Sequence, residues 1–322
     1  ALTAISFPAG RLSQTIFGTK TMDLSMSEIR AFNATVQTGN FTRAGNLMGI
    51  SQPAVTAQIR KLEGRFSQAL FERISRGVQL TPFGEQLYRI TRQYGDLDTM
   101  LKELVQPEGE SGNRVIRVAT ASPLVFMPLL AGFNARYPDS SLRIVGGTTP
   151  ECKKLLLERE VDIGLFPLSA KSADLSSLPY DSHRVAVVLP VDHELAEAES
   201  VSIAQLMAYP LIFSKTDSYT QQCINRVFAN ANLKPVSHVF MDSRHDTCEA
   251  IVYGLGIGFA LQKDIRPDPR YVAVPIAEQL DQPVVEHLVW LKARSELSGI
   301  RDFVNLALDQ QYERSQKDIS LP

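Results

Sequence analysis

The sequence has little cysteine and no long apolar segment, and each shortage excludes a class of protein. Only three cysteines occur in 322 residues, which excludes a small domain held together by disulfide bonds and favours a reducing compartment. No apolar run approaches the roughly eighteen residues that a membrane-crossing helix needs. The charges nearly balance, at a formal net charge of −2. The composition is that of an ordinary globular protein, long enough for two or three domains.

Motifs for catalysis, metal binding and export are also missing. The five histidines show no metal-ligand spacing, and there is no nucleophile elbow, phosphate-binding loop or zinc-protease motif. An enzyme stays an alternative, because a Ser-His-Asp arrangement cannot be recognised without coordinates. Residues 1–21 lack the charged start and apolar core of a secretory signal, and we expect them to be a disordered extension. We therefore expect no cofactor, no metal, no membrane association and a cytoplasmic location.

The most informative stretch is residues 40–63, which predicts two short helices joined by a tight turn. We expect Thr42 to cap the first helix and Gly49 to end it. Ser51 is expected to cap the second helix, with Pro53 in its first turn. The apolar residues of that second helix recur in one stripe, which predicts a face packed on a core: Val55, Ile59, Leu62 and Phe66.

The other side of the second helix carries amide, hydroxyl and guanidinium groups on Gln52, Thr56 and Arg60. A helix of this kind, braced by a preceding helix, has the geometry that enters a DNA major groove. The alternative is a plain helical hairpin in a domain core. Residues 41–80 hold six basic and two acidic residues in a chain that is otherwise slightly acidic. This local basic excess favours contact with phosphates.

Residues 70–80 predict a β-hairpin wing with its turn at Arg76-Gly77. Arg73 and Arg76 would lie near its tip and reach the DNA backbone. At this point three motifs, in order, resemble the DNA-binding domain of LysR-type transcriptional regulators: FTRAGNLMGISQPAVTAQIRKLE, LFER and RGVQLTPFG. One departure is Ala57, which stands where members often carry an arginine.

The resemblance implies DNA binding through the residues at the motif positions. These are Thr42, Arg43, Ser51, Gln52, Pro53, Ala54, Thr56, Arg60, Lys61, Arg73 and Arg76.

A long helix capped by Thr81 and starting at Pro82 is predicted next. Apolar residues recur along it at separations of three and four, which is a heptad seam: Leu87, Ile90, Tyr94, Leu97, Leu101 and Leu104. The economical partner for such a seam is the same helix of a second copy. The alternative is packing against the chain's own DNA-binding domain. A dimer also suits an operator with two half-sites, and the family resemblance favours a dimer of dimers.

Strand and helix patterns alternate after a hinge at residues 107–113, and the alternation over residues 115–166 predicts a parallel α/β sheet. A second set of strands and helices follows from residue 184. We expect two lobes joined by strands that cross between them twice. The motifs VDIGLF, VVLPVDHELA and YGLGIGFAL resemble the effector domain of LysR-type regulators, which has the periplasmic-binding-protein type II fold. The glycines of the last motif follow a helix instead of preceding one, which does not fit a dinucleotide-binding fingerprint.

The predicted fold class is therefore α/β with an N-terminal all-α winged helix-turn-helix domain. The expected boundaries are residues 22–81 for that domain, 82–106 for the dimerisation helix and 114–318 for the effector domain. Within the effector domain we expect lobe I at about 114–184 and 286–318, and lobe II at about 185–285.

Hydroxyl groups gather where the predicted strands of the effector domain end and helices begin. Hydroxyls and helix N-termini favour a carboxylate, sulfonate or phosphonate, so we predict a small anionic effector. The alternative is that these residues only cap helices. The predicted effector-binding residues are Thr120, Ser122, Thr148, Thr149, Ser214, Thr216, Asp242 and Ser243. Residues 243–276 are similar to LysR-type members associated with aminoethylphosphonate use.

Two further alternatives concern the cysteines and the effector domain. Cys152, Cys223 and Cys248 all fall on predicted helices, and a redox-sensing dithiol is the alternative to buried apolar thiols. A solute-binding protein without DNA function would not explain the basic N-terminal module. The sequence thus predicts a DNA-binding activator or repressor of transcription controlled by a small ligand.

Overall fold

The computed structural model describes residues 24–75, 77–105, 114–168, 170, 172–214, 216–237, 239–279 and 283–319. Internal contacts divide the chain into two compact units, residues 1–97 and 98–322. The predicted extension at 1–21, the predicted hinge at 107–113 and Arg76 lie outside the described residues. The helix at Pro82–Val105 crosses the boundary between the units.

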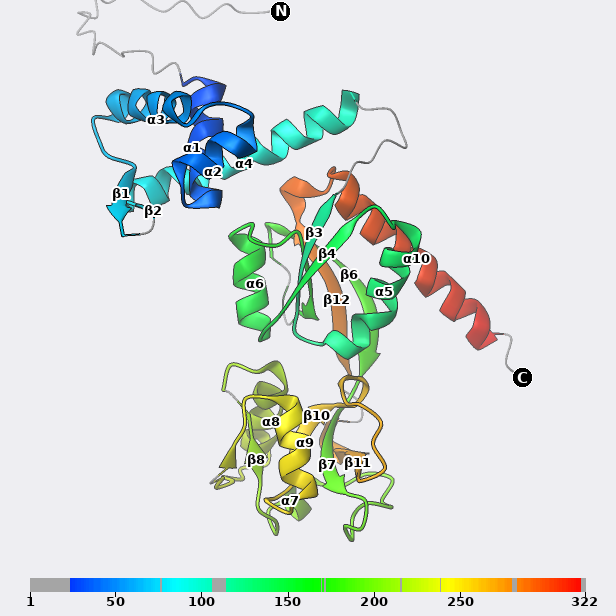
Figure 1. Cartoon of the computed structure of the whole chain (residues 1–322). Helices are drawn as coiled ribbons and strands as arrows, with labels where there is room; N and C mark the ends of the chain where they lie inside the picture. Colours follow the sequence, from blue (N-terminus) through cyan, green and yellow to red (C-terminus); the bar gives the residue numbers. More distant parts are fainter. Residues whose placement is uncertain are drawn as a thin grey trace, which may run out of the picture. The chain divides into compact units, whose positions relative to one another are not determined.

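The N-terminal unit is a bundle of short helices with a β-hairpin (Figure 1). Its elements are α1 (Met26–Thr38), α2 (Phe41–Met48), α3 (Gln52–Phe66), β1 (Phe71–Ile74), β2 (Gly77–Leu80) and the start of α4 (Pro82–Val105). The core includes Phe32 from α1 and the predicted α3 stripe, in which Val55, Ile59 and Leu62 are buried. The two strands pair antiparallel from Phe71–Leu80 to Ile74–Gly77, which confirms the predicted wing. Gly77, predicted in the turn, is instead the first residue of β2.

The cap of α2 differs from the prediction. Asn40, not Thr42, caps this helix, because the Asn40 Oδ1 atom accepts hydrogen bonds from the backbone N–H groups of Thr42 (2.8 Å) and Arg43 (3.2 Å). Thr42 lies inside the first turn. The predicted cap of α3 is confirmed, since the Ser51 hydroxyl accepts from the N–H of Ala54 at 3.4 Å.

The C-terminal unit contains two lobes, each built on its own sheet. In the first lobe a five-stranded sheet has the order β4-β3-β5-β12-β6. Its strands are β3 (Val115–Thr120), β4 (Ser141–Gly146), β5 (Ile163–Pro167), β6 (Leu175–His183) and β12 (Val284–Leu291). One core cluster joins this sheet to α5 (Pro123–Arg136) and α10 (Ser298–Ile319), and a second joins it to α6 (Thr149–Leu157). Figure 1 shows α5 and α10 on one side of the sheet and α6 on the other.

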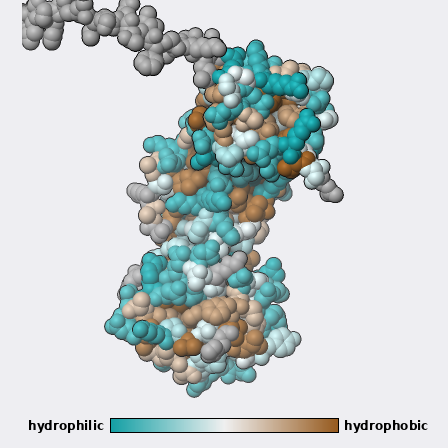
Figure 2. Space-filling view, turned by 90° about the vertical axis from the view of Figure 1, so that its left-hand side faces the viewer, coloured by the Kyte–Doolittle hydropathy of each residue, from teal (hydrophilic) through white to brown (hydrophobic). Residues whose placement is uncertain are grey.

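The second lobe holds a three-stranded sheet of order β10-β7-β11 and a two-stranded sheet of β8 and β9. The strands are β7 (Val185–Pro190), β8 (Ile212–Phe213), β9 (Val239–Phe240), β10 (Gly258–Leu261) and β11 (Tyr271–Pro275). The helices are α7 (Ile203–Leu206), α8 (Tyr219–Asn230) and α9 (Arg244–Val252), with 3-10 turns η1 (Gln262–Asp264), η2 (Ala277–Gln279) and η3 (Lys292–Arg294) along the chain. Hydrophilic and apolar residues are interspersed on the face shown in Figure 2.

The chain passes between the lobes twice, from β6 into β7 and from β11 into β12, which confirms the predicted double crossing. The predicted parallel pairing is confirmed for β3, β4 and β5, the strands from which it was predicted. Only β3, β4 and β5 are parallel in the first lobe, whereas β12 pairs antiparallel with both β5 and β6. The reason is that β12 returns from the second lobe and enters the sheet from the opposite end. In the second lobe β7 is antiparallel to both of its neighbours.

Candidate functional site

The exposed side of α3 is the candidate DNA-reading surface. Gln52 and Pro53 are exposed at its start, and the Gln52 Nε2 atom donates to the Thr56 hydroxyl at 2.8 Å. This contact leaves the amide oxygen and one N–H of Gln52 available, the two groups that a bidentate contact with adenine uses. Gly45 permits the tight turn before α3, because a Cβ atom at this position would lie 2.7 Å from the carbonyl oxygen of Ile50.

Most of the predicted basic residues lie on the surface of this unit. Arg43, Arg60 and Arg73 are exposed, and none of them forms an ion pair with another described residue. Lys61 is also exposed but lies 3.5 Å from the buried carboxylate of Glu28. Of the predicted basic residues that the structure describes, these three arginines are therefore the most available to phosphates.

Glu28 fixes α3 against α1. Its carboxylate accepts two hydrogen bonds from Arg65, at 2.8 and 2.9 Å. Burial alone would raise the pKa of Glu28, but the hydrogen bonds and positive charge of Arg65 outweigh it and hold that pKa below its ordinary value. The ionised carboxylate thus sets the position of the reading helix. Sequence reasoning missed this pair, whose partners are 37 residues apart.

The predicted seam on α4 divides into a buried and an exposed part. Leu87 packs in the core of the N-terminal unit, so the alternative of packing against the chain's own DNA-binding domain holds for this residue. The other seam residues are exposed, with exposed fractions from 37% to 82%: Ile90, Tyr94, Leu97, Leu101 and Leu104. An exposed apolar stripe of this length on one helix is a candidate interface.

A cavity of about 770 Å³ lies between the two lobes. Most of the predicted effector-binding residues line it: Thr120, Ser122, Thr148, Thr149, Ser214, Asp242 and Ser243. Thr216 is the exception. It lies two residues after Ser214 and does not line the cavity. The structure therefore brings together the strand-to-helix junctions that the sequence marked separately.

Some of these hydroxyls are occupied by capping contacts. The Thr148 hydroxyl accepts from the N–H of Glu151, whose carboxylate in turn accepts from the N–H of Thr148. The Ser243 hydroxyl accepts from the N–H of Asp246. Thr148 and Ser243 thus cap helices, and both also line the cavity.

Two other hydroxyls behave differently. The side-chain oxygens of Ser122 and Thr149 are buried and have no hydrogen-bond partner among the described residues. Ser122 precedes α5, and Thr149 begins α6, so both lie at helix N-termini facing the cavity. A buried hydroxyl without a partner carries a desolvation cost that a bound polar group would remove.

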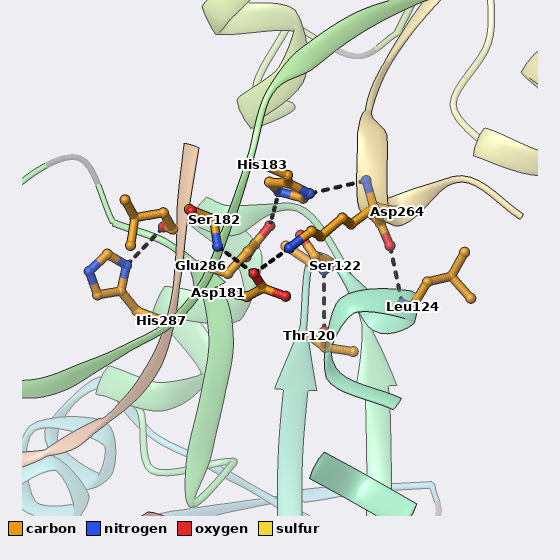
Figure 3. A network of polar contacts seen from close by, with 12 residues as sticks. Thr120, Ser122, Leu124, Asp181, Ser182, His183, Asp264, Glu286 and His287 are labelled. Atoms are coloured by element: carbon orange, nitrogen blue, oxygen red, sulfur yellow. Dashed lines mark hydrogen bonds and ion pairs between the residues drawn. The ribbon is translucent and has the colours of Figure 1, made fainter. Parts of the chain in front are cut away.

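An ion pair that the sequence did not predict forms part of the cavity wall. The Arg244 Nη1 atom lies 2.8 Å from the Asp264 Oδ2 atom, and Arg244 Nη2 donates to the carbonyl oxygen of Ala121. Asp264 Oδ1 accepts from the N–H of Leu124 at 3.1 Å (Figure 3). Burial raises the pKa of Asp264 to about 6, and the opposing charge of Arg244 only partly offsets this.

A second buried pair lies where the strands cross between the lobes. The His183 Nε2 atom is 3.0 Å from the Glu286 carboxylate, and His183 Nδ1 accepts from the N–H of Lys263 (Figure 3). Arg244 stood within a short polar run that the sequence indicated only as a helix start. Asp264, His183 and Glu286 had no local signal, because their partners are distant in the chain.

The cysteines and possible metal ligands give no second site. Cys152 and Cys223 are buried and Cys248 is half-buried. Burial raises the pKa of all three thiols, that of Cys152 to about 12, which disfavours the reactive thiolate. Within the described ranges, no cluster of His, Cys, Asp and Glu could hold a metal ion, and no helix is long and apolar enough to cross a membrane.

A helix-turn-helix with a basic wing, followed by two lobes around a ligand-sized cavity, defines a ligand-binding transcriptional regulator. Comparison with known proteins identifies the family. Residues 26–85 match the bacterial regulatory helix-turn-helix domain of the lysR family, and residues 109–311 match the LysR substrate binding domain. The chain therefore belongs to the LysR family of DNA-binding transcriptional regulators, which are not enzymes.

Relatives of known name support this assignment. The HTH-type transcriptional regulator CysL of Bacillus subtilis is 27% identical over 243 residues, which cover 74% of this chain and 81% of CysL. BudR of Raoultella terrigena is 32% identical over 196 residues, which cover 59% of this chain and 68% of BudR.

Solved structures share the fold. A cysteine variant of full-length OxyR from Pseudomonas aeruginosa superimposes with a TM-score of 0.72 at 19% identity, covering 88% of this chain and 94% of that one. Full-length BenM gives a TM-score of 0.55 at 19% identity, covering 91% and 98%.

Proposed function

We propose that the activity of this LysR-type regulator is controlled by a small anionic ligand bound in the cavity between the lobes. The observation that carries this proposal is the pair of buried, unpartnered hydroxyls of Ser122 and Thr149. Both lie at helix N-termini, where the partial positive charge and the free N–H groups favour an anion. The cavity volume of about 770 Å³ is in the range of sites for small molecules.

The DNA-binding part of the proposal assigns two roles. Gln52, Pro53 and Thr56 read base edges in the major groove. Arg60, Arg73 and Arg76 hold phosphates, with Arg43 beside them. The availability of Arg43, Arg60 and Arg73 outside any ion pair supports this division. Binding to DNA also accounts for a cytoplasmic location.

The exposed seam on α4 supports a proposal for how copies of the chain associate and, through this, for the arrangement of the operator. Two copies joined along Ile90, Leu97 and Leu101 form a dimer, and two such dimers form the proposed tetramer. A symmetric dimer carries two reading helices, so the operator consists of two half-sites about one helical turn, or a multiple of it, apart.

A thermal-shift screen of small anions tests the ligand. A carboxylate, sulfonate or phosphonate that binds the native state raises the melting temperature by mass action. Phosphonates belong in the screen because of the similarity of residues 243–276 to phosphonate-associated members, which stays a prediction.

Two variants locate the binding site of any anion found. Ser122→Ala and Thr149→Val should each reduce the thermal shift. Ser140→Ala is the matched control, because Ser140 is a buried serine of the same lobe outside the cavity. An equal shift in all three variants would move the site elsewhere.

The redox alternative is less well supported. Burial disfavours ionisation of all three thiols, and a thiolate is the form that oxidants attack. An intramolecular disulfide found by mass spectrometry after peroxide treatment would favour that alternative instead.

A further inference from the structure

Arg244 reaches from one lobe to the other through the cavity wall. It is the first residue of α9 in the second lobe. Its guanidinium donates to the carbonyl oxygen of Ala121 in the first lobe, the residue directly before Ser122. Arg244 and Ser122 both line the cavity. The guanidinium is therefore bound to the backbone of the residue next to Ser122 in the chain.

Asp264 is the negatively charged partner of Arg244 in this structure. The Asp264 side chain is fully buried, whereas that of Arg244 is 45% exposed. Both residues line the cavity, and Arg244 is the partner whose side chain keeps exposed surface for a ligand. A guanidinium has five N–H donors, so it can bind a second anion from the cavity side without leaving its place.

A bound anion would put two negative groups, one of them the buried carboxylate of Asp264, against the single guanidinium of Arg244. Like charges in a site of low dielectric constant cannot both be stable, and one of them is neutralised by a proton. The proton has a defined destination, because Asp264 Oδ2 has no hydrogen-bond partner beyond its ion pair with Arg244.

Resting on the proposed anion site, we propose that Arg244 and Ser122 together hold the anionic group of the ligand, and that Asp264 takes up one proton from solvent when the ligand binds. With a ligand group of one negative charge, the proton leaves the net charge of the site unchanged, whereas sulfate, with two negative charges, leaves the site one charge more negative. No covalent bond forms or breaks apart from the new O–H bond of Asp264.

The surroundings of Asp264 favour this residue as the proton acceptor. The charged and titratable groups facing it are Arg244 from α9, His183 from β6 and Glu286 from β12, while α5 offers only the N–H of Leu124. His183 Nδ1 already accepts a hydrogen bond from the N–H of Lys263 (Figure 3). Burial, and then the negative charge of Glu286, raise the pKa of Asp264 to about 6. A small further rise in this pKa is therefore enough to protonate the carboxylate near neutral pH.

Sulfate binding to the full-length protein tests this inference, because sulfate itself does not titrate near neutral pH. The affinity is measured by calorimetry at constant ionic strength from about pH 5.5 to about pH 8, with chloride as the ionic-strength control. Binding raises the pKa of Asp264, so the affinity should be highest below pH 6 and fall by up to about tenfold per pH unit above it. Two buffers of different ionisation enthalpy should report the uptake of close to one proton at about pH 7.

Variants identify the group that takes up the proton. Asp264→Asn should bind sulfate with an affinity that no longer depends on pH and with no proton uptake. His245→Gln is the control, because His245 is another titratable residue lining the cavity, and it should keep both effects. If Asp264→Asn does not fold, the number of protons that the unaltered protein takes up on binding sulfate tests the proposal: close to one supports it and none overturns it.

The outcomes separate this inference from the proposed function. Sulfate binding that is independent of pH, or a pH dependence that survives in Asp264→Asn, would overturn the proton uptake and leave the anion site intact. No sulfate binding even at the lowest pH would overturn both.

Discussion

Leu101 on α4 offers the most direct test of the proposed dimer. This residue exposes 63% of its surface in the single chain. Full burial of a leucine side chain is worth about 1.5–3 kcal/mol, so covering this fraction contributes about 1–2 kcal/mol per protomer. Because a two-fold interface contains the residue twice, Leu101→Ala should cost the dimer about 2 kcal/mol or more, which weakens the dimer at least about thirtyfold.

Leu47 on α2 provides a matched control for this substitution. It is 60% exposed, almost the same as Leu101, but lies outside the seam. The dimer dissociation constants of the unaltered protein, Leu101→Ala and Leu47→Ala are compared by analytical ultracentrifugation over a dilution series. Equal dissociation constants for the two variants would refute the seam as the dimer interface.

Three other predictions follow from the DNA surface and the core of the first lobe. Gln52→Ala should reduce discrimination between a selected operator and random DNA by about 1–3 kcal/mol in competition binding. Arg73→Ala should instead weaken both DNAs alike and lower the salt slope by about one. Asp162→Asn should destabilise the first lobe by roughly 3 kcal/mol, because Asp162 is a buried partner of Arg117 and Arg294. Burial would raise the pKa of Asp162, but Arg117 and Arg294 outweigh this and lower it, so its stabilisation is present at neutral pH and lost as acid protonates it. The difference in melting temperature between the unaltered protein and Asp162→Asn should therefore shrink below about pH 4.

Local patterns predicted the N-terminal unit well. The stripe of α3, its Ser51 cap and the hairpin wing depend on contacts between neighbours in sequence, and all three are confirmed. The cap of α2 was assigned wrongly because Asn40 and Thr42 are both good capping residues two positions apart. Only the backbone geometry distinguishes them.

The sheets and the ion pairs were less predictable because they depend on distant residues. Strand β6 was missed, since Pro179 interrupts its apolar pattern. Proline is tolerated there because β6 is the edge strand of its sheet. Asp264 binds the backbone of Leu124, 140 residues away, and no local pattern indicates such a pairing. The cavity-lining hydroxyls were found because strand-to-helix junctions are local. The structure was needed to show that the oxygens of Ser122 and Thr149 are buried without a partner among the described residues.

The central claim is that this protein reads DNA with α3 and holds its backbone with a few exposed arginines. The measurement that tests it most directly is the affinity of the full-length protein for a duplex selected from random sequences, determined over a range of salt concentrations. The logarithm of the affinity should fall linearly with the logarithm of salt concentration, with a slope of about −0.9 per phosphate contacted, and the selected duplexes should share two half-sites. An affinity that does not depend on salt, or a selection that yields no common sequence, would contradict the account.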